Sequence, residues 1–341
     1  MTETATPTEN VQIRLAARPE GLPKASDFET TRGAVPEPAE GQILVRNIYL
    51  SLDPAMRGWM TERKSYIEPI QLGDVMRGLT LGEVVSSSAD GFAEGDLVSG
   101  SLGWQSYALA HPKEVQKVPK GQPLPLFLGP LGMTGLTAYF GLLEIGAPQA
   151  GETVVVSAAA GAVGSVVGQI AKIRGCRVVG IAGGPEKCAL LTEELGFDAA
   201  VDYKKDDLPK ALKAACPKGI DVYFDNVGGT ILDVCLGLLN FKARVPFCGA
   251  ISQYNATEPV PGPYNYLSIL INRARVEGFI VFDFAKKYPE ALQQLGRWVA
   301  EGKLEGRYDI MDGLENAPQA LLRLFDGSNK GKLIVQIGPE P

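Results

Sequence analysis

The sequence of 341 residues has few of the side chains that bind catalytic zinc or act as general bases. It contains a single histidine, His111, and its first cysteine is Cys176. Catalytic zinc needs about three protein ligands from cysteine, histidine and carboxylates, so we expect no metal site. A Ser-His-Asp or Cys-His site would need His111 as its base. Because His111 precedes Pro112 at an expected strand end, we interpret it as a surface or structural residue.

The sequence also lacks a surplus of positive charge and any long hydrophobic run. Its 33 basic and 39 acidic residues give a net charge of -6, whereas nucleic-acid binding favours a basic surplus on one face. No stretch approaches the roughly 18 apolar residues of a membrane span. The first ten residues, MTETATPTEN, lack the basic and apolar regions of a secretory signal. We therefore expect a cytoplasmic protein without nucleic-acid or membrane partners.

Disulfide pairing is not indicated by the cysteines. They are odd in number and form no CxxC pair: Cys176, Cys188, Cys216, Cys235 and Cys248. Several lie in or beside apolar segments, as small buried hydrophobic residues of a reducing compartment do. The cysteine pattern therefore agrees with a cytoplasmic location.

The chain is long enough for two domains, and its texture changes near residue 130. Before that point, short alternating runs such as 42–46, 82–85 and 95–100 end in glycine-rich turns. This pattern predicts an all-β, barrel-like domain.

After residue 130, β-branched runs alternate with helical patterns, which predicts a parallel sheet covered on both faces. The expected strands are 153–157, 177–182, 199–202, 220–224 and 244–248, and the expected helices are 135–143, 162–174, 185–195, 230–239 and 288–301. Pro246 interrupts the last strand pattern. A helix at 317–325 and a strand at 332–336 close the chain, and we expect that strand to rejoin the first domain's sheet.

A glycine-rich segment, Ser157–Gly168, follows the first of these strands and opens a helix. We expect Gly161 to permit the tight turn, Gly164 to let the backbone approach a pyrophosphate, and Gly168 to let helix and sheet pack closely. Ala159 stands where the first glycine of the common fingerprint would be. In this context the segment favours a dinucleotide site over a simple strand-helix turn.

The charge pattern after the second strand indicates which dinucleotide binds. That strand ends in Ala182-Gly183-Gly184, without the acid that accepts a hydrogen bond from the ribose of NAD. Lys187 follows within one turn, and Tyr203 follows the third strand. A nearby ammonium without a carboxylate favours a 2′-phosphate, and hence NADP(H). Glu186 must then point away from the phosphate.

Motifs along nearly the whole chain are similar to those of the medium-chain dehydrogenase/reductase superfamily. The chain most resembles its zinc-independent branch of prostaglandin and leukotriene B4 reductases and alkenal or curcumin double-bond reductases. The matching segments are 50–58, 132–139, 157–168, 193–198, 223–229, 248–255, 277–279 and 329–332. The resemblance implies an α/β fold with a GroES-like β-barrel domain over 1–128 and 310–341, and a Rossmann domain with a doubly wound parallel sheet over 129–309. It also implies a homodimer.

The resemblance assigns cofactor contacts residue by residue. Gly161, Ala162, Val163 and Gly164 would hold the pyrophosphate, and Lys187 with Tyr203 would hold the 2′-phosphate. The remaining positions that match cofactor-lining residues of the family are Met133, Thr137, Asn226, Cys248, Gly249, Ala250, Ser252, Tyr254, Phe279, Ile280, Val281 and Asn329.

Two positions depart from the mammalian members of the family. Ala55 replaces the aromatic residue of the DPYMR motif. The family also carries a tyrosine about five residues before an Arg-x-Glu-Gly run, and counting back from Glu277 of that run places it near Ile271. Tyr264 and Tyr266 are placed to supply a hydroxyl from the neighbouring loop. The physiological substrate therefore stays open.

The implied reaction is transfer of a hydride from NADPH to the β-carbon of an α,β-unsaturated ketone or aldehyde. Without zinc, a donor must stabilise the enolate oxygen. We favour Tyr266 and then Tyr264, ahead of Tyr49 and Tyr66, and Arg57 is a further candidate for holding the enolate or a substrate acid. The alternatives are an NADPH:quinone reductase and a non-catalytic NADPH-binding protein.

Overall fold

The computed structural model describes residues 9–341, and the chain divides into two units. Unit 1 comprises the described residues up to Leu128 with 308–328 and 333–341, and unit 2 comprises 129–307 and 329–332. The segment from which we argued against a secretory signal lies largely outside the described residues.

Residues 329–332 group with unit 2, whereas we expected all of 310–341 in the first domain. Gly331 forms a bridge with Gly161, and the Lys332 amide donates to the Arg307 carbonyl over 2.7 Å. These backbone contacts hold the segment against the glycine-rich loop.

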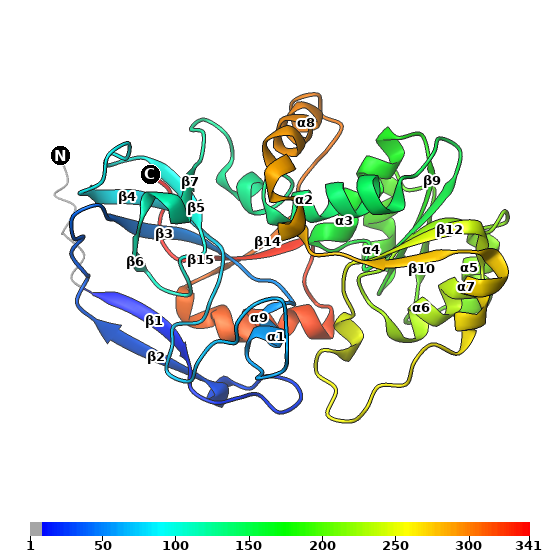
Figure 1. The fold of residues 1–341 in the computed structure, drawn as a ribbon, viewed down its shortest axis with the longest axis horizontal. Helices are drawn as coiled ribbons and strands as arrows, with labels where there is room; N and C mark the ends of the chain where they lie inside the picture. Colours follow the sequence, from blue (N-terminus) through cyan, green and yellow to red (C-terminus); the bar gives the residue numbers. More distant parts are fainter. Residues whose placement is uncertain (1–8) are drawn as a thin grey trace. The chain divides into compact units, whose positions relative to one another are not determined.

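Unit 1 is built around a sheet with the strand order β14-β15-β3-β4-β5-β7, and β6 pairs with β3. Its elements are β1 (Asn10–Leu15), β2 (Phe28–Gly33), β3 (Ile43–Ser51), α1 (Met56–Trp59), β4 (Thr80–Ser87), β5 (Leu97–Gly100), β6 (Tyr107–Ala110), β7 (Val115–Lys117), β14 (Tyr308–Asp312), α9 (Ala317–Asp326) and β15 (Lys332–Gln336). The C-terminal strand β15 runs antiparallel to β3, with Ile334 opposite Ser51 (Figure 1). The predicted β domain and its returning strand are confirmed.

Unit 2 contains a six-stranded parallel sheet with the order β10-β9-β8-β11-β12-β13. Its elements are α2 (Met133–Phe140), β8 (Thr153–Ser157), α3 (Ala162–Ile173), β9 (Arg177–Ala182), α4 (Pro185–Ala189), β10 (Ala199–Asp202), α5 (Leu208–Ala215), β11 (Ile220–Phe224), α6 (Gly229–Leu236), β12 (Leu239–Phe247), α7 (Leu267–Asn272), β13 (Arg275–Gly278) and α8 (Tyr288–Ala300). The strand order reverses between β8 and β11, so the sheet is doubly wound, as expected.

The central strand β8 is buried on both faces, which explains its unbroken hydrophobic pattern. Val154 and Val156 pack in one cluster with Val167 of α3 and Leu295 of α8. Val155 belongs to a second cluster with side chains of α5 and α6. Because side chains alternate along a strand, one run of valines supplies both cores.

Two features of the sheet were not evident in the sequence pattern. Pro246 lies inside β12, opposite Glu277 of β13. The Pro246 carbonyl accepts from the Asp225 amide over 2.9 Å. The strand therefore forms despite the missing N–H, and it is longer than predicted. The polar segment β13 forms an edge strand beside β12, which explains its lack of a buried hydrophobic run. Across residues 9–341, no helix has the length and apolar character needed to cross a membrane.

Candidate functional site

The glycine-rich loop of unit 2 joins β8 to α3. Gly161 caps the helix with an ordinary φ of -83°, whereas Ala158 has a φ of 48°. The left-handed residue of the turn is therefore Ala158 and not Gly161. Gly161 closes the turn through its amide, which donates to the Ala158 carbonyl over 2.9 Å, and a Cβ on it would lie 3.1 Å from that oxygen. A Cβ on Gly164 would lie 2.4 Å from the Ala158 carbonyl oxygen. Glycine at 164 thus lets the loop fold directly onto α3, whose first N–H groups lack acceptors within the helix.

Gly168 lies one turn further along α3, directly against the ring of Phe197. A Cβ at this position would stand 1.8 Å from the ring carbon Cζ. Phe197 lies in the segment before β10, so Gly168 permits close packing of α3 against this ring, and its predicted contact with the sheet itself is not shown. Any side chain at position 168 would have to displace this ring or α3.

A buried carboxylate, Asp225, connects the loop to the neighbouring strand ends. Its Oδ1 accepts from the Tyr223 hydroxyl over 2.7 Å, from Ser157 Oγ over 3.1 Å, and from the amides of Val227 and Gly228 over 3.0 and 2.9 Å. Burial raises the pKa of Asp225 above its usual range. The side chain thereby holds the ends of β8 and β11 together.

Asn226, a predicted cofactor contact, is fixed by the same strand end. Its backbone amide donates to Ser157 Oγ over 2.9 Å, and its side-chain amide donates to the Ser157 carbonyl over 2.8 Å. The carboxyl ends of β8 and β11, where the strand order reverses, are the usual place for a dinucleotide in such a sheet.

The turn after β12 packs onto this arrangement. The Asp225 carbonyl accepts from the amides of Cys248 and Gly249 over 2.8 and 3.1 Å. Further along the turn, Ser252 Oγ donates to the Val227 carbonyl over 2.6 Å, and the Ala250 amide donates to the Tyr254 hydroxyl over 3.2 Å. The five residues predicted in this turn therefore lie beside Asn226.

The ends of β9 and β10 form a second group. A Cβ on Gly183 would lie 2.9 Å from Cε1 of Tyr203, so the tyrosine ring covers this glycine. Asp202 Oδ1 accepts from the amides of Gly184 and Lys204 over 2.8 and 3.1 Å. These bonds connect the turn after β9 to the turn after β10. The Tyr203 side chain beside them is 43% exposed.

Glu186 is turned toward Lys330 and forms an ion pair with it over 2.7 Å. The hydrogen bond from Lys330 lowers the pKa of the Glu186 carboxyl. Its neighbour Lys187 lies in the same short helix, α4. The carboxylate that had to avoid a phosphate thus has a cationic partner of its own.

The remaining predicted cofactor contacts lie at α2 and after β13. The Tyr288 hydroxyl donates to the Val281 carbonyl over 3.0 Å and approaches Met133 Sδ at 3.8 Å, while Thr137 Oγ1 donates to the Met133 carbonyl. The Phe279 ring packs edge-on against Phe224, so its side chain belongs to the core. Phe279 can therefore offer a ligand mainly its backbone, while Ile280 beside it is half-buried.

Asn329, the last predicted contact, is buried and donates from Nδ2 to the Gly331 carbonyl over 2.9 Å. Because Gly331 bridges to Gly161, this segment lies beside the glycine-rich loop. The predicted cofactor residues all lie in unit 2, and those of the glycine-rich loop, Asn226 and the turn after β12 lie side by side. Their contacts with a cofactor stay a prediction.

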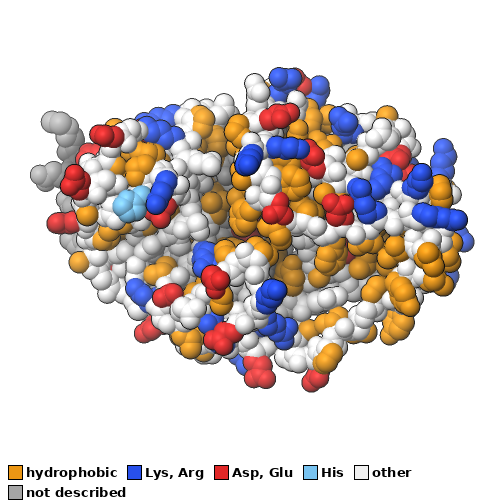
Figure 2. All heavy atoms as spheres, viewed as in Figure 1, with side chains coloured by type: hydrophobic (Ala, Val, Ile, Leu, Met, Phe, Trp, Pro, Cys, Tyr) orange, Lys and Arg blue, Asp and Glu red, His pale blue; other side chains and the backbone are white. Residues whose placement is uncertain are grey.

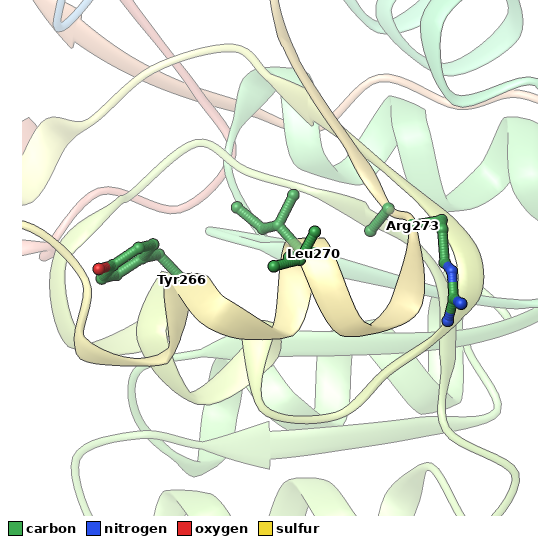
Figure 3. Close-up of a pocket in the computed structure, with 5 residues that line it drawn as sticks. Tyr266, Leu270 and Arg273 are labelled. Carbon is green, nitrogen blue, oxygen red and sulfur yellow. The ribbon is translucent and has the colours of Figure 1, made fainter.

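The two favoured tyrosines lie elsewhere in unit 2, at the start of α7. Tyr264 is 82% exposed and Tyr266 is 65% exposed. Tyr266 lines an open cavity of about 500 Å³ with Ile269, Leu270, Arg273 and Ala274. Figure 3 shows Tyr266 and Arg273 at the two ends of α7, with Leu270 between them. Exposure to water provides no preorganised environment for a developing charge, so the catalytic role of these tyrosines stays a prediction.

Two of the candidate donors to the enolate that belong to unit 1, Arg57 and Tyr49, are hydrogen-bonded to other groups of the protein. Arg57 is buried and donates to the carbonyls of Pro19 and Gly21 over 2.9–3.1 Å. The Tyr49 hydroxyl donates to Glu340 over 2.8 Å, and burial raises its pKa to about 12. Tyr66, the other tyrosine ranked below Tyr264 and Tyr266, is 52% exposed. His111 is exposed on the surface, as we interpreted it.

Comparison with known proteins identifies the family. Residues 11–118 match a model described as the N-terminal domain of oxidoreductase, and 162–297 match one described as zinc-binding dehydrogenase. The second stretch contains no histidine, and within residues 9–341 no three His, Cys, Asp or Glu side chains gather as a metal site.

Relatives resemble the chain over nearly its full length. A putative NADP-dependent oxidoreductase of Bacillus subtilis, YfmJ, is 50% identical over 96% of this chain and 97% of its own. The NADPH-dependent curcumin reductase of Escherichia coli is 47% identical over 95% of both. The crystal structure of CurA from Vibrio vulnificus in complex with NADPH is 46% identical, covers 97% of this chain and 100% of its own, and superposes with a TM-score of 0.93. The chain belongs to the zinc-independent branch of the medium-chain dehydrogenase/reductase superfamily.

Proposed function

We propose that this chain is an NADPH-dependent reductase of the C=C bond in α,β-unsaturated ketones and aldehydes. The observation that carries the proposal is the grouping in unit 2 of the glycine-rich loop, Asn226 and the turn after β12, in a member of a family whose relatives include an NADPH-dependent curcumin reductase. It acts without zinc.

The residues present fit the cofactor. A side chain at Gly164 would collide with the Ala158 carbonyl, and one at Gly183 would collide with Tyr203. Glycine at both positions lets the loop and the turn fold closely against their neighbours at the strand ends, where a dinucleotide is expected. When bound, NADPH supplies the hydride that reduces the β-carbon of the substrate. The start of α3 would hold the pyrophosphate, and Lys187 with Tyr203 would hold the 2′-phosphate.

A tyrosine hydroxyl is our proposed donor to the enolate oxygen of the substrate. Tyr266, Tyr264 and Arg57 stay candidates from the sequence. Tyr254 is a further candidate because it lies among the predicted cofactor contacts. Its hydroxyl accepts a hydrogen bond from the Ala250 amide, in the turn beside Asn226. Such donors contribute most when they are fixed before the charge develops, and losing one typically costs about 3 kcal/mol.

The nearest alternative is an NADPH:quinone reductase, since quinones also accept a hydride. Steady-state loss of NADPH absorbance over a panel of enones, enals and benzoquinones separates the two. We expect kcat/KM for enones to exceed that for quinones. Turnover of quinones alone would select the alternative, and NADPH binding without consumption of any acceptor would indicate a non-catalytic protein.

A homodimer is the proposed assembly, and an exposed apolar face of unit 2 supports it. Within residues 9–341, β13 is paired only with β12, so one edge of the sheet is open to a further strand. Nearby, Leu267, Leu270 and Ile271 are more than half exposed. Figure 2 shows hydrophobic side chains gathered at the right, where Figure 1 draws α6 and α7.

Light scattering during size exclusion tests this assembly. Leu270→Arg would place a charge in the apolar face and should convert a dimer to a monomer, while Leu109→Arg, an exposed leucine of unit 1, should leave it dimeric. A monomeric parent protein would remove the proposal. Cytoplasmic location is likewise proposed, and the five unpaired cysteines support it.

A further inference from the structure

We infer that Lys204 is a specificity-determining residue for NADPH, a second ammonium placed for the 2′-phosphate beside the one expected at Lys187. The inference rests on the proposed position of that phosphate at the ends of β9 and β10. Lys204 directly follows Tyr203 in the sequence and is not among the residues predicted above to bind the cofactor.

The first observation is the fold of the lysine side chain over Gly183. A Cβ on Gly183 would lie 3.0 Å from Cε of Lys204 and 3.1 Å from Cζ of Tyr203. The ammonium and the phenol oxygen are each one bond beyond these atoms. Two side chains therefore carry their polar ends to the same glycine, where a 2′-phosphate is expected at the end of β9.

The second observation is the anchoring of the lysine backbone. Asp202 Oδ1 accepts from the amides of both Gly184 and Lys204 over 2.8 and 3.1 Å. One buried carboxylate thus fixes the turn that carries Lys204 to the turn that carries the ribose site. These bonds anchor the backbone of Lys204 beside the turn of Gly183 and Gly184, and the side chain then reaches Gly183 with its Cε atom.

The third observation concerns the nearby acids, each of which has another partner. Asp202 bonds the two amides, Asp206 accepts from the Asp202 amide over 2.9 Å, and Glu186 pairs with Lys330. Among the described residues 9–341, the Lys204 ammonium forms no ion pair with a carboxylate. Its charge is therefore available to an incoming dianion, which an ammonium binds as a point charge.

The test uses Lys204→Met, which keeps most of the aliphatic contact with Gly183 and removes the charge. Lys205→Met is the matched control, because this adjacent lysine has the same charge and exposure but no contact with Gly183. Dissociation constants of the full chain are measured by calorimetry for NADPH, NADH and adenosine 2′,5′-bisphosphate. Lys187→Ala is measured in parallel.

We expect Lys204→Met to weaken NADPH and the bisphosphate about fivefold, with NADH changed less than about twofold, and Lys205→Met to change none of them. Lys204→Arg should retain the preference. A loss no larger than that of Lys205→Met, or an equal loss for NADH, would overturn the inference. If Lys187→Ala also leaves NADPH binding unchanged, the proposed phosphate site itself is wrong, whereas an effect of Lys187→Ala alone rejects only the role of Lys204.

Discussion

The Glu186 carboxylate and the Lys330 ammonium lie 2.7 Å apart, and this contact joins α4 to the segment that follows α9. Both side chains are largely exposed, so the pair contributes little to stability. Its effect is on the local charge, because the glutamate is the residue next to Lys187. Pairing draws a negative charge away from the proposed phosphate site.

The first prediction follows from this pair. Lys330→Met should release Glu186 and weaken NADPH binding about two- to fivefold by repulsion, while NADH binding stays unchanged. The added change Glu186→Gln should restore the NADPH affinity. Calorimetric titration of the four proteins gives the coupling between the two residues. Purely additive losses would show that the pair does not influence the phosphate site.

Packing between Gly168 and Phe197 gives the second prediction. Gly168→Ala would force a methyl group into the ring and should lower the free energy of unfolding by about 1–3 kcal/mol. Gly296→Ala is the control, since nothing lies within 4 Å of a Cβ at this helical position. The control should gain about 0.5–1 kcal/mol. Denaturant melts measure both, and equal stabilities would contradict the observed contact.

A pH dependence follows from the burial of Asp225. Folding raises the pKa of this carboxyl above its unfolded value of about 3.9. The stabilisation is therefore fully present below pH about 4 and is lost as pH rises through the raised native pKa. The free energy of unfolding of the parent protein should fall relative to Asp225→Asn across this range.

Denaturant melts at several pH values measure this difference. Asp225→Ala leaves the donors of Tyr223, Ser157 and two amides without an acceptor, so it should lose about 3 kcal/mol or more at every pH. A parent-minus-Asn difference that stays constant with pH would show that Asp225 does not titrate abnormally.

The fourth prediction separates the candidate hydroxyls. Tyr254→Phe should lower kcat on an enone about tenfold or more, because a donor near the cofactor is lost. Tyr266→Phe should change kcat less than about threefold, since that side chain is 65% exposed. Calorimetric NADPH affinities serve as the control for both. A large loss in Tyr266→Phe with an intact Tyr254→Phe would return the role to Tyr266.

The sequence was sufficient for the succession of strands and helices along the chain and for the glycine-rich loop at the start of α3. The contacts of the predicted residues with a cofactor stay a prediction. Continuous valines mark a strand buried on both faces, and glycines mark close backbone approach, so β8 and Gly168 were recognisable. Edge strand β13 was not, because an edge needs no hydrophobic run. The left-handed turn at Ala158 was missed because alanine rarely adopts it.

The direction in which each side chain points was harder to predict from the sequence than the strands and helices were. Nothing in the sequence distinguishes Lys204 from Lys205, and only the structure shows which of the two lies against Gly183. The same holds for Asp225, which stood within a matching motif without a role. A buried carboxylate that accepts four hydrogen bonds could be recognised only once the strands were placed.

The central claim is hydride transfer to the β-carbon of an activated double bond without zinc. Turnover of an enone with NADPH deuterated at the transferable position tests it most directly, with the product analysed by NMR. We predict a saturated ketone that carries the deuterium on its β-carbon, at an unchanged rate after treatment with a metal chelator. An allylic alcohol with deuterium on the former carbonyl carbon, or loss of turnover on chelation, would contradict the account.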